Sequence, residues 1–172
     1  MAESSEYQSY IDQLHSHNSN LVIEAAYSLG NLGCKQSVPA LIEVLQTTTD
    51  PSVRNAVAIG LQEIGDERAL CPLVSIIVDP KTEGYRGTLI YALEGFDCSC
   101  ILPLLVELVI AGNFEVSHQA FLIIESIKTV VDKTTLNLCI KKVQDTLLSA
   151  NGNKSDLLED LIQLLDKISA YT

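Results

Sequence analysis

The sequence has no tryptophan and few aromatic residues of any kind, since Phe, Trp and Tyr together make up 5% of its 172 residues. The apolar content, 47% of the chain, therefore comes mainly from Leu, Ile, Val and Ala, which closely spaced helices bury well. The longest apolar stretch, residues 101–112, is interrupted by Pro103 and Glu107 and is too short to span a bilayer. These absences predict a helical protein without a membrane partner.

Basic residues are also scarce. Eleven Lys and Arg stand against 22 Asp and Glu, which gives a formal net charge of −11, and the longest basic run is Lys141 and Lys142. Such a chain repels phosphate backbones, so nucleic acid is excluded as an expected partner. A basic protein partner is favoured instead, because opposite charge steers the encounter.

The five cysteines are an odd number, and several stand among apolar residues, which does not fit a disulfide framework. No charged and apolar leader opens the chain, so we expect no signal peptide and a reduced, cytoplasmic protein. Cys98 lies near a predicted helix start, where a thiol can have a lowered pKa, and is a candidate reactive thiol, with Cys34 in the turn after Gly33 as the other. Cys71 and Cys139 are expected in the core.

A repeat of about 32 residues dominates the sequence. Segments 18–33, 50–65, 82–97 and 113–128 share four apolar columns at steps of four, four and three, which mark one face of a helix. The columns are Leu21, Val53, Tyr85 and Val116; Ala25, Val57, Leu89 and Ala120; Leu29, Leu61, Leu93 and Ile124; and Leu32, Ile64, Phe96 and Ile127. Gly33 and Gly65 follow as expected helix C-caps.

A second predicted helix precedes each later copy, over residues 37–45, 70–78 and 101–109. Each carries a proline in its first turn, where the missing N–H is tolerated. Antiparallel helix pairs of this kind bury their apolar faces by stacking in series. We therefore predict an all-α, right-handed alpha-solenoid, an armadillo-like superhelix of about five helix pairs. It forms one domain, 1–172, with an N-terminal cap pair at about 5–33, central repeats at about 34–131 and a C-terminal cap pair at about 132–170.

The second copy matches a known pattern, D-x-x-V-R-x-x-A-x-x-A-L-G-x-I-G-D followed by alanine. The matching residues are Asp50, Val53, Arg54, Ala58, Leu61, Ile64, Gly65, Asp66 and Ala69. In this the chain resembles HEAT repeats, most closely the short HEAT-like repeats of phycobilisome lyases, over about residues 18–131. The resemblance implies a fold rather than one activity, because such repeats occur in lyase subunits, scaffolds, regulators and inhibitors.

The later helix of each pair is expected to line a concave groove. The residues expected to bind a partner there are Ile23, Tyr27, Asn55, Ile59, Gln62, Glu63, Tyr91, Glu94, His118, Leu122 and Glu125. They combine an apolar stripe with an acidic edge, and tyrosine is a favoured interface anchor. The alternative is that the helix pairs are slightly rotated, so that the stripe packs against the opening helices.

No zinc-ligand spacing, phosphate loop or nucleophile motif occurs, so we expect no catalytic residue, metal or cofactor, and predict that the chain is not an enzyme. The leading prediction is a monomeric or homodimeric protein-interaction module. It would hold a basic or partly apolar protein in the acidic groove, as an inhibitor or immunity protein or as a scaffold. The alternative, which the resemblance implies, is a phycobilin lyase subunit or a chaperone-like protein acting on a tetrapyrrole-bearing protein.

Overall fold

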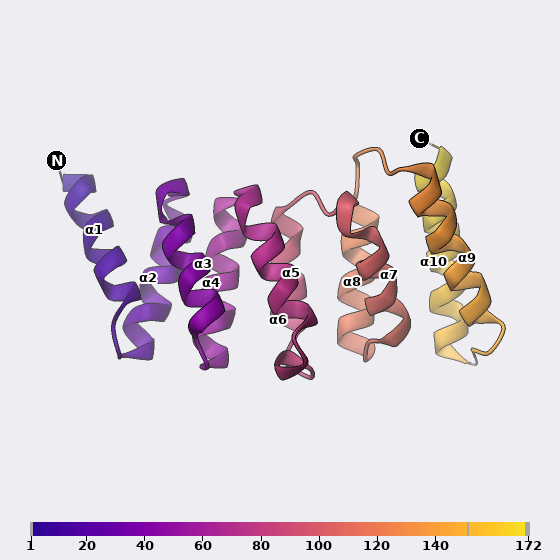
Figure 1. The fold of residues 1–172 in the computed structure, drawn as a ribbon, viewed down its shortest axis with the longest axis horizontal. Coiled ribbons are helices and arrows are strands. Elements are labelled where there is room, and N and C mark those ends of the chain that lie inside the picture. The colour runs from indigo at the N-terminus through magenta and orange to yellow at the C-terminus, as the bar shows by residue number, and fades with distance from the viewer. Residues whose placement is uncertain (1, 151, 171–172) are drawn as a thin grey trace. The chain divides into compact units, whose positions relative to one another are not determined.

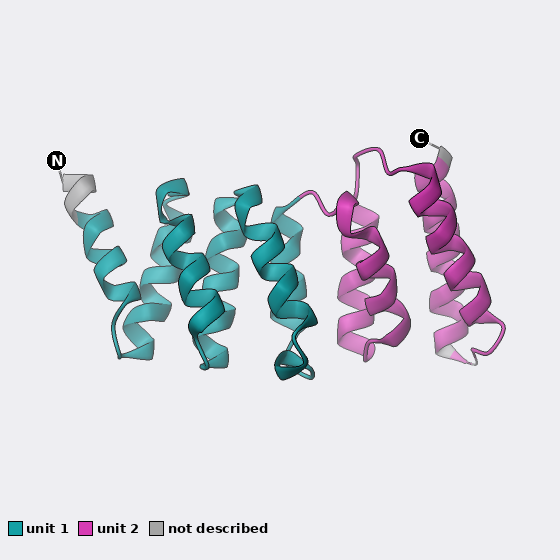
Figure 2. Cartoon of the chain, in the orientation of Figure 1, with its two compact units in different colours: residues 1–96 teal, residues 97–172 magenta. Residues whose placement is uncertain are grey.

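The computed structural model describes residues 2–150 and 152–170, and these contain ten α-helices joined by short turns, with no strand among them (Figure 1). The predicted all-α solenoid of stacked helix pairs is confirmed. The chain divides into two compact units, unit 1 over 1–96 and unit 2 over 97–172 (Figure 2). The single domain with two cap pairs stays a prediction. None of the described helices is long and apolar enough to cross a membrane.

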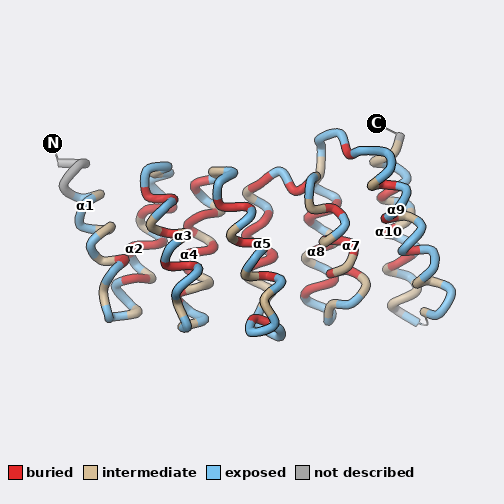
Figure 3. Tube along the Cα trace, in the orientation of Figure 1, coloured by how far each residue is buried: buried red, intermediate tan, exposed pale blue. Residues whose placement is uncertain are grey.

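Unit 1 holds three helix pairs in two layers. Its α-helices are α1 (Ala2–Leu14), α2 (Ser19–Asn31), α3 (Val38–Thr47), α4 (Pro51–Ile64), α5 (Leu70–Val78) and α6 (Gly87–Tyr91). Helices α1, α3 and α5 pack in one layer, and α2, α4 and α6 pack in the other. Buried positions recur along the sides on which these helices meet (Figure 3).

Local chemistry sets the ends of the helices in unit 1. The side chains of Asn18 and Asp50 cap α2 and α4 by accepting hydrogen bonds from the backbone N–H two residues later, at 3.0 and 2.8 Å. Gly33 and Gly65 both follow a helix with φ of 60°, a left-handed conformation that glycine adopts without steric cost. The predicted glycine C-caps are therefore confirmed.

The two middle apolar columns are fully buried in every copy. Three residues of the outer columns are exposed instead, namely Leu21, Leu32 and Tyr85. In the first copy Val22 takes the buried place beside Leu21, and Leu32 lies past the end of α2. The repeat period therefore locates the centre of each helix better than its ends.

The third copy departs furthest from the expected helix over 82–97. Helix α6 begins only at Gly87, after a 3-10 turn (η3, Pro80–Thr82), and a second 3-10 turn (η4, Ala92–Gly95) replaces its last part. The hydroxyl of Thr82 donates to the carbonyls of Ile76 and Asp79 at 2.7 and 2.8 Å, and Gly84 has φ of 87°. These local bonds hold residues 79–86 as a loop and delay the helix.

Unit 2 contains two helix pairs, α7 (Leu102–Ala111) with α8 (Phe114–Ser126) and α9 (Lys133–Leu147) with α10 (Asn153–Ala170). Helix α7 packs against both α8 and α9. Its Pro103 stands in the first turn, as predicted. Thr129, which follows α8, donates a hydrogen bond of 2.8 Å to Asp97 and holds the connection to α9 in place.

Candidate functional site

The predicted surface of unit 1 lies on the layer formed by α2, α4 and α6. Tyr27 on α2 and Tyr91 on α6 are 44% and 43% exposed, and Ile59 on α4, at the corresponding register position, is half-buried. Glu63 and Glu94 are exposed beside them. Part of each tyrosine side chain is therefore accessible to a partner. That they bind one remains a prediction.

The remaining predicted residues of unit 1, Ile23, Asn55 and Gln62, are half-buried. The amide oxygen of Gln62 is buried and accepts no hydrogen bond from any residue that the structure describes. The helix layer is tight here, because a Cβ placed on Gly95 would lie 2.6 Å from the carbonyl oxygen of Gln62. Gln62 thus contributes mainly to packing between repeats.

The three predicted residues of unit 2 are exposed on α8. The ring of His118 stacks on that of Phe114, with centroids 6.0 Å apart and planes 2° apart. Glu125 stands at the other end of the helix, with Leu122 between them. Each unit therefore presents its own part of the predicted surface.

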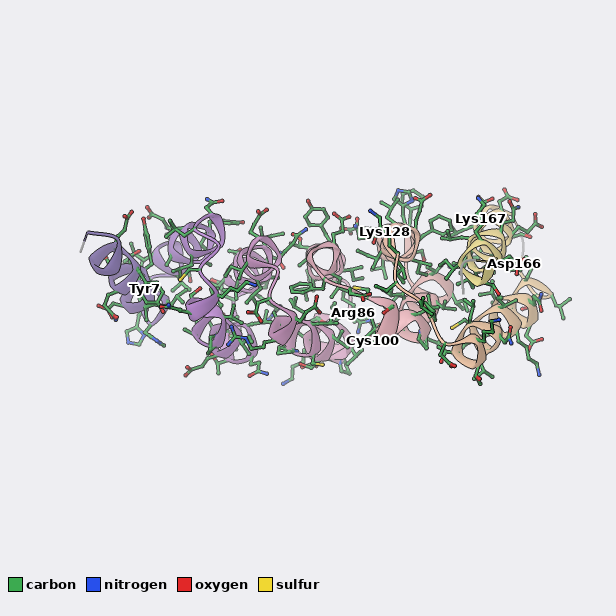
Figure 4. The ribbon with its side chains drawn as sticks, turned by 90° about the horizontal axis from the view of Figure 1, so that it is seen from above. Tyr7, Arg86, Cys100, Lys128, Asp166 and Lys167 are labelled. Atoms are coloured by element: carbon green, nitrogen blue, oxygen red, sulfur yellow. The ribbon has the colours of Figure 1, made fainter. Side chains whose placement is uncertain are left out.

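Two pockets of about 410 Å³ each lie between α8 and α10. One is lined by Glu125, Ile127, Lys128, Thr129, Val130, Leu164, Lys167 and Ile168. The other is lined by Gly112, Phe114, Ser117, His118, Lys154, Asp156, Leu157 and Asp160. Figure 4 shows Lys128 beside α8 and Lys167 on α10. The sequence prediction found one residue of the first pocket and one of the second.

Lys154 in the second pocket has a structural role. Its ammonium group donates hydrogen bonds to the carbonyl of Val109 and to the hydroxyl of Ser117, the latter at 3.3 Å. Burial lowers the pKa of Lys154. The lysine therefore ties the start of α10 to the α7–α8 pair.

A third pocket, of about 370 Å³, was missed by the sequence prediction. We call it the edge pocket; it lies in unit 1 between the α3–α4 turn and the loop at 79–86. Its lining includes the cations Arg54 and Lys81, the carboxylate of Asp79, the ring of Tyr85 and the threonine run at 47–49. The apolar columns continue through 82–86, so they gave no signal that the structure has a loop there in place of a helical turn.

Arg86 stabilises the loop beside this pocket. Its Nη2 donates to the carbonyl of Asp79 at 3.3 Å, and its Nε is buried without an acceptor among the described residues. Figure 4 shows this side chain turned toward the interior of its unit. Arg86 therefore has a structural role, whereas Arg54 lines the open pocket.

The cysteine predictions fare unevenly. Cys98 is 2% exposed, so its selection as the reactive thiol is contradicted, because a helix start can itself be buried. Cys71 is exposed although it was expected in the core, since it points away from the buried Leu70 and Leu73 on α5. Cys139 is buried as predicted, and burial raises the pKa of its thiol. In the part of the chain that the structure describes, no group of three or more His, Cys, Asp or Glu side chains is placed to hold a metal ion.

The sequence matches one family model and two curated proteins of the same name. A sequence model of the family described as HEAT repeats matches residues 8–94, just over half of the chain. Over 64 residues, 37% of its length, the chain is 41% identical to "Bilin biosynthesis protein PecE" of Nostoc sp. (strain PCC 7120). It is 43% identical over 64 residues to the protein of the same name from Mastigocladus laminosus.

These 64 residues cover 25% and 24% of the two relatives, so the chain spans about a quarter of the length of the curated relatives it matches. The resemblance to HEAT repeats of the phycobilisome-lyase type is confirmed. The prediction that the chain is not an enzyme is contradicted, because both relatives are named for the biosynthesis of a bilin.

Proposed function

The chain belongs to the HEAT-repeat family, and we propose that it acts in bilin biosynthesis, as a lyase subunit or chaperone-like protein for a tetrapyrrole-bearing protein. One observation carries the proposal: the identity of 41% over 64 residues with a bilin biosynthesis protein. The main prediction, binding of a protein partner, becomes one part of this function, since a lyase subunit has to bind the protein that carries the bilin.

The chemical structure of a bilin determines the kind of binding site that such a protein needs. A bilin is a linear tetrapyrrole, so it combines a flat apolar body with propionate carboxylates. A site for it needs apolar or aromatic walls and a few placed cations. Pockets of this composition occur in both units, and each pairs apolar walls with lysine or arginine side chains. Holding the bilin near its acceptor would raise the rate by proximity and orientation.

The experiment that tests this function mixes the purified chain with biliverdin, a commercially accessible bilin, and records the absorbance spectrum. We expect a saturable shift of the long-wavelength band, because a bound bilin is held in fewer conformations than a free one. The Tyr27→Ala/Tyr91→Ala variant is titrated in parallel with a Leu148→Ala control, whose apolar side chain is 89% exposed and lines none of the pockets described above. If the spectrum of the bilin stays unchanged at every protein concentration, and no bilin-carrying protein is retained by the immobilised chain, the proposal is wrong.

A second function rests on a separate observation. The exposed tyrosines of unit 1 stand beside Glu63 and Glu94, in a unit whose 96 residues hold 12 acidic and 5 basic side chains. Such a surface suits a basic or partly apolar protein partner. Replacement of Tyr27 and Tyr91 by alanine should weaken capture of that partner, and added salt should slow its association. If neither the tyrosine replacements nor added salt changes the capture of the partner, this surface is not the binding site.

A further inference from the structure

We propose that the edge pocket binds a propionate carboxylate of the bilin, with Arg54 and Lys81 as its cationic partners. This inference rests on the proposed function and assigns the part of the chain that recognises the anionic end of the ligand. It is carried by three observations: a local departure from the repeat, two cations that donate no hydrogen bond within the described residues, and an open volume of ligand size.

The departure from the repeat creates the pocket. Helices α2, α4 and α8 begin directly after their capping residues. In the third copy, the loop at 79–86 takes the place of the first helical turns and carries Lys81 and Tyr85 to the pocket. Places where a sequence breaks its own local rules are often functional. The loop is nevertheless held by specific bonds, because Asp79 accepts from the backbone N–H of Lys81 at 2.9 Å.

The pocket carries more positive than negative charge, because Arg54 and Lys81 outnumber Asp79, whereas the chain as a whole is acidic. Arg54 stands in the first turns of α4, where the partial positive charge of the helix end disfavours a cation and favours an anion. Asp50, its acidic neighbour, already accepts from the hydroxyl of Ser19 at 2.7 Å and from its capping N–H. Within the described residues, neither the Arg54 guanidinium nor the Lys81 ammonium group donates a hydrogen bond. An anion placed between them would meet two cations and a helix N-terminus.

The shape and walls of the pocket fit one end of an amphipathic acid. Its volume of about 370 Å³ lies within the range of small-molecule sites. Ile76, which is half-buried, provides apolar wall, and Tyr85, 68% exposed, offers a ring on which a pyrrole can stack. The hydroxyls of the threonine run at 47–49 supply further donors to a carboxylate. A bilin propionate with its adjoining ring meets each of these groups.

The two pockets between α8 and α10 are weaker candidates for this role. In one of them the ammonium group of Lys154 uses two of its three N–H donors on Val109 and Ser117, and the pocket also holds Asp156 and Asp160, which disfavour an anion. In the other, Lys128 and Lys167 share their pocket with Glu125, as Arg54 and Lys81 share theirs with Asp79, so the difference between the two pockets is that this one has no arginine. Arginine binds carboxylates with two parallel hydrogen bonds, which favours the edge pocket.

The test compares biliverdin with biliverdin dimethyl ester, in which both carboxylates are uncharged. Affinities are measured by absorbance titration for the wild-type chain and for Arg54→Ala, Lys81→Ala and Arg54→Lys. Lys141→Ala, an exposed lysine of α9, is the matched control for the loss of one positive charge. Far-UV circular dichroism checks that each variant keeps its helix content.

We expect Arg54→Ala to bind biliverdin about ten-fold more weakly than the wild type, since one charge-assisted contact is lost. Lys81→Ala should lose somewhat less, Arg54→Lys should recover part of the affinity, and Lys141→Ala should bind like the wild type. The dimethyl ester should bind the wild type weakly and should show no further loss in the variants.

Wild-type binding that is equal for acid and ester, or unchanged in Arg54→Ala, overturns the assignment of the pocket and leaves the proposed function standing. A wild type that binds no free bilin but retains a bilin-carrying protein overturns the pocket as the bilin site, while the function holds through the protein surface. Arg54→Ala can also fail to retain the bilin-carrying protein while the wild type binds biliverdin and its dimethyl ester equally well. That result assigns the pocket to a carboxylate of the captured protein and also refutes the proposal.

Discussion

Replacement of Gly60 by alanine tests the close packing of α2 against α4, on which the register of the second-helix layer depends. A Cβ at this position would lie 2.5 Å from the carbonyl oxygen of Ala26 and 3.2 Å from its carbonyl carbon. The first distance is about 1 Å shorter than ordinary contact. Both atoms belong to the backbone, so the clash is relieved only if the two helices move apart.

The expected cost follows from two opposing effects. Alanine is favoured over glycine inside a helix by about 1 kcal/mol. Overpacking of a well-filled interface costs roughly 1–3 kcal/mol, and a rigid backbone contact belongs at the upper end. We therefore expect Gly60→Ala to lower the free energy of unfolding by about 2 kcal/mol, which corresponds to a melting temperature lower by about 4–8 °C for a chain of this size.

Gly30→Ala provides a graded comparison. Its Cβ would meet the Cα of Gly60 at 2.8 Å and the carbonyl oxygen of Gly60 at 3.1 Å, a milder clash, so its loss of stability should be smaller. The assay is urea unfolding followed by far-UV circular dichroism, with midpoints compared because repeat arrays need not unfold in one step. A Gly60→Ala protein as stable as the wild type, or more stable than Gly30→Ala, would refute the packing described above.

Three further predictions concern single groups. The Arg68 guanidinium lowers the pKa of Asp66 from 3.8 to about 2. The stabilisation from this carboxylate is therefore present above about pH 3.8 and is lost as the pH falls toward 2. Asp66→Asn should show a smaller drop in urea midpoint between pH 5 and pH 2 than the wild type. Ser117 is buried, and its hydroxyl lies within hydrogen-bond distance of the carbonyls of Val109 and Gly112, at 2.9 and 3.0 Å. Ser117→Ala should therefore lower the free energy of unfolding by about 1–2 kcal/mol in the same assay. An unchanged midpoint would show that this hydroxyl adds no stability. A thiol reagent followed by mass spectrometry should label Cys71 and Cys100 in the native protein and the buried thiol Cys98 only after unfolding; rapid native labelling of Cys98 would contradict its burial.

The sequence predicts the helical architecture well because its signals are local and periodic. Apolar steps of four, four and three placed Leu29, Leu61 and Leu93 in the core, and all three are fully buried. Gly33 and Gly65 marked helix ends because no other residue adopts their backbone conformation as readily. The late start of α6 escaped prediction because hydrogen bonds from Asp79 and Thr82 compete with the helix at a place where the apolar columns still continue.

The surface is less predictable than the core. Helical register identified Tyr27 and Tyr91 as exposed, because the side of a helix opposite its buried columns faces outward. The edge pocket combines a turn and a loop about 30 residues apart in the sequence. Neither segment carries a motif from which their proximity could be predicted. Cys71 and Cys98 exchanged their expected environments, since position along a short helix does not determine which side of it is covered.

The most direct test of a role in bilin biosynthesis is the rate at which a bilin becomes covalently attached to an acceptor protein. Extract from a bilin-producing cell that lacks the chain would be supplied with apoprotein and bilin, with and without the purified chain, and the adduct followed by its fluorescence after denaturing electrophoresis. Adduct that forms faster, or with a more uniform spectrum, when the chain is added agrees with the proposed function. Identical rates and spectra in both mixtures, with a chain that is folded by circular dichroism, contradict it.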